Sequence, residues 1–196
     1  MRSMKIVLCG PPRSGKSCLR QALKDAIRRS SEIYPYVLST NPDGEGAWFQ
    51  ETVAANPELA TELKRENKRP WSAERAELYA TWVRDVAGPL TFVDIGGIPD
   101  VFSEQIARPA THLLLLAPNE EKIAPWRAFA ERVGVPVIGE IWSDYHGTED
   151  RVDGLGEDGI YRGVVHHLER GHPAHDRPLV RALAKYLVGR LEGGEP

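Results

Sequence analysis

The chain of 196 residues has little cysteine, no long hydrophobic run and no strong excess of charge of one sign. Its two cysteines, Cys9 and Cys18, are too few for a disulfide framework, so we predict that both are reduced packing residues. The apolar run over residues 6–9 is far too short for a signal peptide or a membrane-spanning helix. We therefore expect a cytoplasmic protein with no membrane partner.

The composition is that of an ordinary soluble domain, with 41% hydrophobic and 27% charged residues. The net charge of −3 and the pI near 6.1 do not demand nucleic acid or an acidic membrane as partner. This length suits one α/β domain with a full core. We expect a single domain over residues 1–192 and a disordered tail over residues 193–196.

Short apolar segments alternate with amphipathic ones along the chain. We predict buried strands at residues 5–9, 36–40, 90–94, 112–117 and 135–141. We predict helices at residues 15–29, 120–133 and 178–191, and three helical pieces within 47–87. This alternation predicts a three-layer α/β/α domain of the P-loop NTPase class, with a five-stranded, mainly parallel sheet in the order 2-3-1-4-5. Residues 143–162 are polar and glycine-rich, and we predict a long loop there.

The segment Gly-Pro-Pro-Arg-Ser-Gly-Lys-Ser matches the phosphate-loop pattern G-x-x-x-x-G-K-[ST] in full. A predicted strand precedes it and a predicted helix follows it, which is the context that the motif requires. Backbone N–H groups of such a loop point at phosphate oxygens, and the helix start adds a positive dipole end. We assign nucleotide binding to Gly10, Pro11, Pro12, Arg13, Ser14, Gly15, Lys16, Ser17 and Cys18.

Individual side chains of this loop have distinct expected roles. We expect Lys16 to act catalytically by reaching the β- and γ-phosphates, and the Ser17 hydroxyl to be a Mg²⁺ ligand. Arg13 either contacts a phosphate or points to solvent, and the sequence leaves both open. ATP is the expected substrate and Mg²⁺ the expected cofactor.

A second acidic signal stands at the end of the predicted strand over residues 90–94. Asp94 ends this apolar segment, where we expect a catalytic carboxylate and the second metal ligand. Ile95 occupies the next position, so the glutamate that many ATPases place there is absent. Gly97 completes a D-x-x-G spacing, which lets a backbone N–H approach the γ-phosphate. The guanine-reading motif N-K-x-D is missing, since residues 119–122 read Asn-Glu-Glu-Lys, so we expect an adenine nucleotide.

Asp43 and Glu45 lie in a glycine-rich turn after the second predicted strand. Ligands bind at this end of the strands in doubly wound sheets. A kinase needs a base near its acceptor hydroxyl, so we list both acids as catalytic candidates. The alternative is a solvated turn that caps the next helix.

Other polar segments are less specific. The basic residues 64–69 and Arg75 suit a lid or an anionic partner, and a solvated helix face is the simpler interpretation. Arg162 and Arg170 follow the predicted long loop; either is placed to reach a γ-phosphate, and we favour a structural role for each. The histidine-rich segment 144–176 lacks zinc-ligand spacing, and its role stays open.

Four segments together resemble a known family: the phosphate loop, Pro42–Glu51, Phe92–Gly97 and His167–Gly171. The set is similar to the P-loop, AAA-like ATPase domain joined to some CRISPR-associated ring nucleases, which degrade cyclic oligoadenylate. The resemblance implies a role in type III CRISPR antiviral signalling, with a ring nuclease or cyclic oligoadenylate as partner. Because this sequence carries no separate nuclease domain, the resemblance implies a stand-alone protein or one that acts in trans.

Three functions follow from these patterns. The first is a regulatory ATPase whose nucleotide state is read by a partner. The second is a small-molecule or nucleotide kinase with Asp43 or Glu45 as base. The third is a nucleotide-binding scaffold with little turnover. The sequence leaves open whether the chain forms a homo-oligomer.

Overall fold

The computed structural model describes residues 3–41, 48–67 and 70–193 of the chain. The predicted acids Asp43 and Glu45 lie outside the described residues, as does most of the predicted tail. Gly193 is described, and it ends the last helix in a left-handed conformation.

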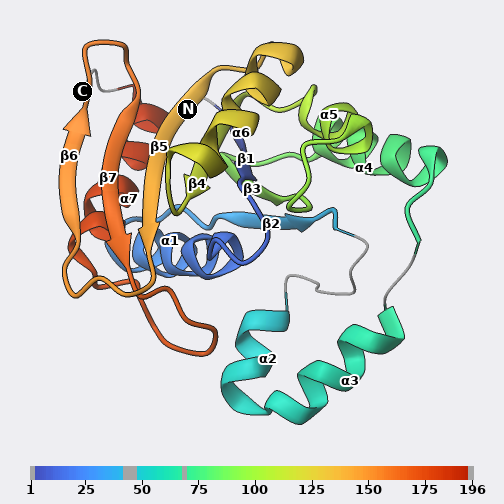
Figure 1. Cartoon of the computed structure of the whole chain (residues 1–196), viewed down its shortest axis with the longest axis horizontal. Helices are drawn as coiled ribbons and strands as arrows, with labels where there is room; N and C mark the ends of the chain where they lie inside the picture. Colours follow the sequence, from blue (N-terminus) through green and yellow to red (C-terminus); the bar gives the residue numbers. More distant parts are fainter. Residues whose placement is uncertain (1–2, 42–47, 68–69, 194–196) are drawn as a thin grey trace.

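The described chain forms one seven-stranded sheet in the order β2-β3-β1-β4-β5-β7-β6 (Figure 1). Neighbouring strands are parallel except β6, which runs antiparallel to β7. The strands are β1 (Met4–Cys9), β2 (Tyr36–Ser39), β3 (Leu90–Asp94), β4 (His112–Ala117), β5 (Val137–Asp144), β6 (Arg151–Leu155) and β7 (Tyr161–His166).

The prediction of five strands in the order 2-3-1-4-5 is therefore wrong, and so is the predicted loop over residues 143–162. β5 continues to Asp144, and β7 pairs with it in parallel. A tight turn then joins β6 to β7: Gly156 N–H donates to Ile160 O at 3.0 Å, and Asp158 Oδ1 accepts from Ile160 N–H at 3.2 Å. The polar, glycine-rich composition of this segment thus belongs to a hairpin at the edge of the sheet.

Helices cover both faces of the sheet. Successive apolar residues of its central strands point to opposite faces, so each face offers an apolar surface to helices. Ile6 and Leu8 pack with α1 (Lys16–Ser30) and α7 (Pro178–Glu192) on one face. Val7 and Cys9 face the opposite side, in the cluster that includes residues of α4 (Ala73–Asp85), α5 (Val101–Ala107) and α6 (Glu120–Val133). The sequence analysis did not predict α5, which begins where Asp100 accepts a hydrogen bond from Ser103 N–H at 2.8 Å.

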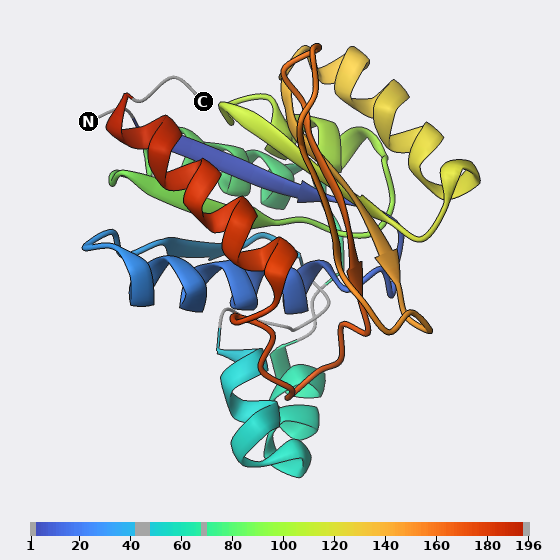
Figure 2. The ribbon, with the colours of Figure 1, turned by 90° about the vertical axis from the view of Figure 1, so that its left-hand side faces the viewer.

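Two helices, α2 (Phe49–Ala55) and α3 (Pro57–Asn67), stand apart from these layers (Figures 1 and 2). Figure 2 shows the connection between β7 and α7 running down to this helical pair. A Cβ atom on Gly171 of that connection would lie 3.7 Å from Ala54 Cα, so the two segments are in contact. The pair and the connection meet on the side of the sheet where α1 begins.

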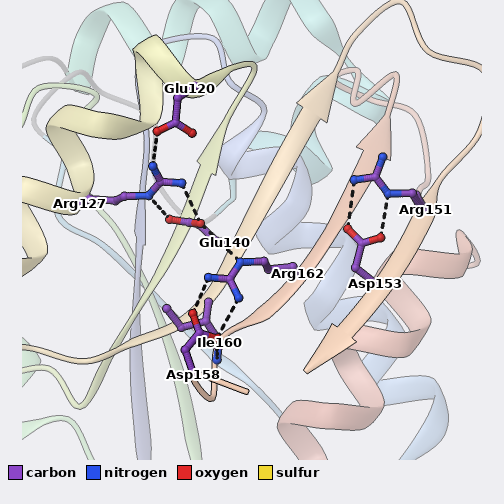
Figure 3. A network of polar contacts seen from close by, with 8 residues as sticks. All are labelled: Glu120, Arg127, Glu140, Arg151, Asp153, Asp158, Ile160 and Arg162. Carbon is purple, nitrogen blue, oxygen red and sulfur yellow. Dashed lines mark hydrogen bonds and ion pairs between the residues drawn. The ribbon is translucent and has the colours of Figure 1, made fainter. Parts of the chain in front are cut away.

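A buried carboxylate ties β5 to its neighbours (Figure 3). Glu140 is 4% exposed and accepts two hydrogen bonds from Arg127 of α6, at 2.5 and 3.0 Å. Arg162 of β7 lies 3.7 Å from the same carboxylate and donates to Asp158 at 2.6 and 2.8 Å. The hydrogen bonds that Arg127 donates to Glu140 raise the pKa of the Arg127 guanidinium. This network joins α6, β5 and the hairpin that extends the sheet.

Candidate nucleotide-binding site

A cavity of about 610 Å³ lies over the carboxyl ends of the central strands. Its volume is within the range of small-molecule sites, roughly 300–1,000 Å³. Residues from six parts of the fold line it. They are Pro12, Arg13, Ser14, Gly15, Lys16, Ser17 and Cys18 of the phosphate loop, Ser39, Asn41, Lys64, Asp94, Ile95, Gly97, Tyr145, Leu168 and Arg170.

The phosphate loop adopts the curled backbone that the motif predicts. Gly15 has φ +89° immediately before α1, a conformation that glycine adopts without steric cost. Arg13 also has a positive φ, +62°, and its side chain lines the cavity. The Lys16 ammonium donates to Gly10 O at 2.8 Å and Pro11 O at 3.0 Å. The lysine therefore lies against the inside of its own loop.

Ser17 and Asp94, the two residues expected to bind the metal, are in contact. The Ser17 hydroxyl donates to Asp94 Oδ2 at 2.9 Å. This contact joins the first turn of α1 to the end of β3, because β1 and β3 pair in parallel with Leu8 opposite Asp94. A hydroxyl and a carboxylate are both hard oxygen donors, which fit Mg²⁺. These two residues are the ones that would hold the ion.

The structure adds Arg20 to this pair, a residue that the sequence analysis missed. Arg20 is 2% exposed, and its Nη1 donates to Asp94 Oδ2 at 2.9 Å. Its Nε has no hydrogen-bond partner within the described chain. Ser17 and Arg20 are three residues apart and thus share one helix face. That spacing was the available signal, although it does not reveal which strand the face would meet.

The loop after β3 packs closely on the phosphate loop. A Cβ atom on Gly97 would lie 2.6 Å from Pro12 N, which a side chain does not tolerate without movement. Thr40 fixes the β3 end from the other side, since its N–H and its hydroxyl both donate to Asp94 O at 3.0 Å. The D-x-x-G segment is therefore held beside the phosphate loop.

Two positively charged side chains line the cavity from segments outside the central sheet and the helices that cover it. Lys64 of α3 and Arg170 of the β7–α7 connection both line it. Both also contact the ring of Phe49, with Lys64 Nζ 5.6 Å and Arg170 Cζ 5.0 Å from its centroid. Cation–π contacts of this kind orient a charged side chain. Of the two arginines considered from sequence, Arg170 belongs to the site, whereas Arg162 belongs to the Glu140 network.

Three other expected features have clear positions. Asn119 accepts a hydrogen bond from Lys122 N–H at 3.0 Å and caps α6, so its side chain serves the helix start. Cys9 and Cys18 are free thiols, and burial raises the pKa of the Cys9 thiol. In the histidine-rich segment, His166 Nδ1 lies 2.6 Å from the buried Asp150. No cluster of His, Cys, Asp or Glu suited to a metal ion occurs in the part of the chain that the structure describes.

No protein-family model matches the chain, and no curated protein matches its sequence. Solved structures do match. One is a protein of Borrelia burgdorferi described as a plasmid partition protein and bound to AMPPNP, at 10% identity and a TM-score of 0.62 over 98% of both chains. Another is the septum site-determining protein MinD of Pyrococcus horikoshii complexed with Mg-ADP, at 12% identity and a TM-score of 0.62, again over 98% of both chains.

A third match is a nucleotide-binding protein of Archaeoglobus fulgidus in complex with ADP, at 14% identity and a TM-score of 0.53. This match covers 99% of the present chain and 89% of the other. The chain has the P-loop NTPase fold. At these identities the likeness concerns the fold alone, and nothing in the comparisons bears on a ring nuclease or on CRISPR signalling. Within the described residues, no helix is long and apolar enough to span a membrane.

Proposed function

We propose that the chain is a P-loop NTPase that binds ATP with Mg²⁺ and hydrolyses it slowly, as a regulatory ATPase. One observation carries the proposal: the Ser17 hydroxyl lies 2.9 Å from Asp94 Oδ2 beside a complete phosphate loop. These two residues would hold a magnesium ion, which would supply positive charge to the phosphate oxygens of the nucleotide. The matched structures with Mg-ADP and with AMPPNP support this assignment by analogy of fold.

The charges around the cavity support a polyanionic ligand. Four cationic side chains line it: Arg13, Lys16, Lys64 and Arg170. Asp94 is the one carboxylate among the described lining residues, and Arg20 is already paired with it. A nucleoside triphosphate brings several negative charges, which charge-assisted hydrogen bonds from lysine and arginine stabilise. The cavity therefore suits a triphosphate better than a neutral metabolite.

A buried hydroxyl within the loop points the same way. Ser14 is 4% exposed, and its Oγ has no hydrogen-bond partner among the described residues. Leaving a buried polar atom unpaired costs about 1–3 kcal/mol, so such atoms in native proteins usually have a partner. A phosphate oxygen seated in the loop would supply one.

A low rate of hydrolysis is expected from the residue that follows Asp94. A hydrolase needs a group that orients or activates the attacking water. Ile95 follows Asp94 where many ATPases carry a glutamate, and the described part of the cavity wall offers no other carboxylate. We therefore expect ATP hydrolysis at a low basal rate, suited to a switch read by a partner.

The kinase alternative depends on Asp43 or Glu45, which the structure does not describe, and the scaffold alternative depends on the absence of turnover. A role beside a ring nuclease rests on the four-segment resemblance alone. One experiment separates these functions: incubate the protein with γ-labelled ATP and Mg²⁺, with and without a metabolite pool and cyclic oligoadenylate. Labelled phosphate release independent of acceptors supports the ATPase. Label in an acceptor supports the kinase, and tight binding without release supports the scaffold.

Binding itself is tested by Lys16→Ala, with Lys185→Ala as the control lysine on the exposed side of α7. Contacts to charged phosphates contribute roughly 1.5–3 kcal/mol each, so Lys16→Ala should weaken ATP binding by about tenfold or more in calorimetry. Lys185→Ala should bind as the wild type does. Equal ATP affinity in all three proteins would refute the assignment of Lys16.

A further inference from the structure

Two aromatic side chains lie side by side at the carboxyl ends of the strands, the end of the sheet where the phosphate loop also lies. β5 and β7 end at the paired residues Asp144 and His166. Tyr145 directly follows β5, and His167 directly follows β7. Their rings stack, with 5.0 Å between centroids and an angle of 29° between planes. The pairing of the last two parallel strands therefore places this aromatic pair.

The Tyr145 ring belongs to the phosphate-loop cavity. Tyr145 lines that cavity together with Leu168 and Arg170, and it is 50% exposed. A half-exposed aromatic ring in a cavity offers a stacking surface to a flat ligand. Tyr145 follows β5, which is separated from β3 and Asp94 by two strands in the sheet order, so we assign it no role in metal binding.

The ring is also held in place before any ligand arrives. His167 Nδ1 lies 3.1 Å from Tyr145 O, and His167 has an unusual φ of +41°. Arg177 donates to His167 O at 2.9 Å and also contacts His166 O, so the start of the β7–α7 connection is fixed at its backbone. A ring oriented in this way costs little side-chain entropy when a ligand stacks on it.

The direction of a bound nucleotide follows from the strand order. Asp94 and Gly97 mark β3, on one side of β1, as the place for the metal and the terminal phosphate. The rest of the nucleotide then extends to the other side, over β4 toward β5. Adjacent strands lie about 4.8 Å apart, so β5 is roughly 10 Å from β1. That offset matches the distance from the phosphates of a nucleotide to its base.

We propose that Tyr145, held by His167, is the platform on which the base of the bound nucleotide stacks. This inference rests on the proposed nucleotide binding and adds the means by which the base is recognised. Stacking reads the aromatic face of a base and tolerates different ring edges. Asn119, which stands where a guanine-reading residue would be, is occupied in capping α6. Purine bases, with the larger ring surface, are the ligands that this platform fits.

The test compares Mg-ATP with Mg-tripolyphosphate, which has the same phosphate chain and no base. Calorimetry is carried out on the wild type, Tyr145→Ala, Tyr145→Phe and the control Tyr36→Ala, an exposed tyrosine of β2 at the other edge of the sheet. Tyr145→Ala should weaken ATP binding by about tenfold or more and leave tripolyphosphate binding unchanged. Tyr145→Phe and Tyr36→Ala should bind both ligands as the wild type does.

His167→Ala should show the same split between the two ligands to a smaller degree, because it only positions the ring. Equal ATP affinity in Tyr145→Ala and the wild type would overturn the platform while leaving nucleotide binding intact. An equal loss of both ligands in Tyr145→Ala would also overturn it, since the tyrosine would then act on the phosphates or the fold. A wild-type protein that binds neither ligand would instead refute the proposed function itself.

Discussion

Arg20 and Asp94 form a buried ion pair: the Arg20 Nη1 donates to Asp94 Oδ2 at 2.9 Å, and the arginine is 2% exposed. The Ser17 hydroxyl shares the same carboxylate oxygen. The side chain expected to bind the metal is thus also one half of a buried ion pair that joins α1 to β3. Folding and metal binding depend on the same carboxylate.

Removing the arginine should destabilise the protein strongly. Arg20→Ala leaves Asp94 buried without its cation, and breaking such a pair costs about 3–5 kcal/mol. The free energy of unfolding should fall by that amount in denaturant titrations. Arg29→Ala, an exposed arginine of the same helix, is the control and should change it by less than about 0.5 kcal/mol. A small loss in Arg20→Ala would mean that Asp94 does not rely on the pair.

The metal site is probed by Ser17→Ala and Asp94→Asn. Ser17→Ala removes an oxygen ligand and Asp94→Asn removes the negative charge of one, so the increase in ATP affinity that Mg²⁺ gives the wild type should largely disappear, and Mg²⁺-dependent hydrolysis should be lost. Some binding should remain through Lys16 and the loop N–H groups. Ser30→Ala, at the far end of α1, controls for loss of a helix hydroxyl. Wild-type turnover in Asp94→Asn would show that Asp94 is structural.

Arg170 should matter for turnover, and Arg162 should not. Arg170 lines the cavity over Phe49, whereas Arg162 pairs with Asp158 in the hairpin. A lost arginine contact to the terminal phosphate corresponds to roughly a 10- to 100-fold lower hydrolysis rate, or about 1.4–2.8 kcal/mol. We expect this decrease in Arg170→Ala, measured as phosphate release at saturating ATP. The idea fails if Arg162→Ala has the same effect.

His112 should make the protein less stable in mild acid. Burial, and secondarily the charge of Arg190, lower the pKa of His112 below its usual 6.5. The unfolded chain therefore takes up a proton at higher pH than the folded protein does, and stability is lost as pH falls below about 6.5. Titrations of the wild type and His112→Gln should diverge only in this window, with the wild type losing more. Parallel curves would exclude His112 as the cause.

The elements best predicted from sequence are those whose pattern is local. The strand at residues 90–94 coincides with β3, and the helix at 120–133 with α6. The hairpin of β6 and β7 was missed because its glycines and acids read as a loop. Asp158-Gly159, a hairpin turn signal, was the indication available.

The residues of the candidate site likewise fall into those with a local sequence signal and those without one. The phosphate loop is a continuous motif, and Asp94 follows from a strand that ends in an acid. Arg20, Tyr145 and Leu168 were not predicted, since each enters the site only through a packing or pairing partner far away in sequence. Their roles depend on which strands are neighbours, and no local pattern in the chain encodes that choice directly.

Leu168 covers Gly15 so closely that a Cβ atom on the glycine would lie 2.9 Å from Leu168 Cδ1. The phosphate loop precedes Leu168 along the chain, so it is synthesised before the residue that covers it. A nascent chain in which only β1 and α1 have been synthesised lacks the later residues that line the nucleotide cavity. We expect cleavage of the β7–α7 connection by a protease to weaken ligand binding, because it would detach Leu168 from the phosphate loop that it covers.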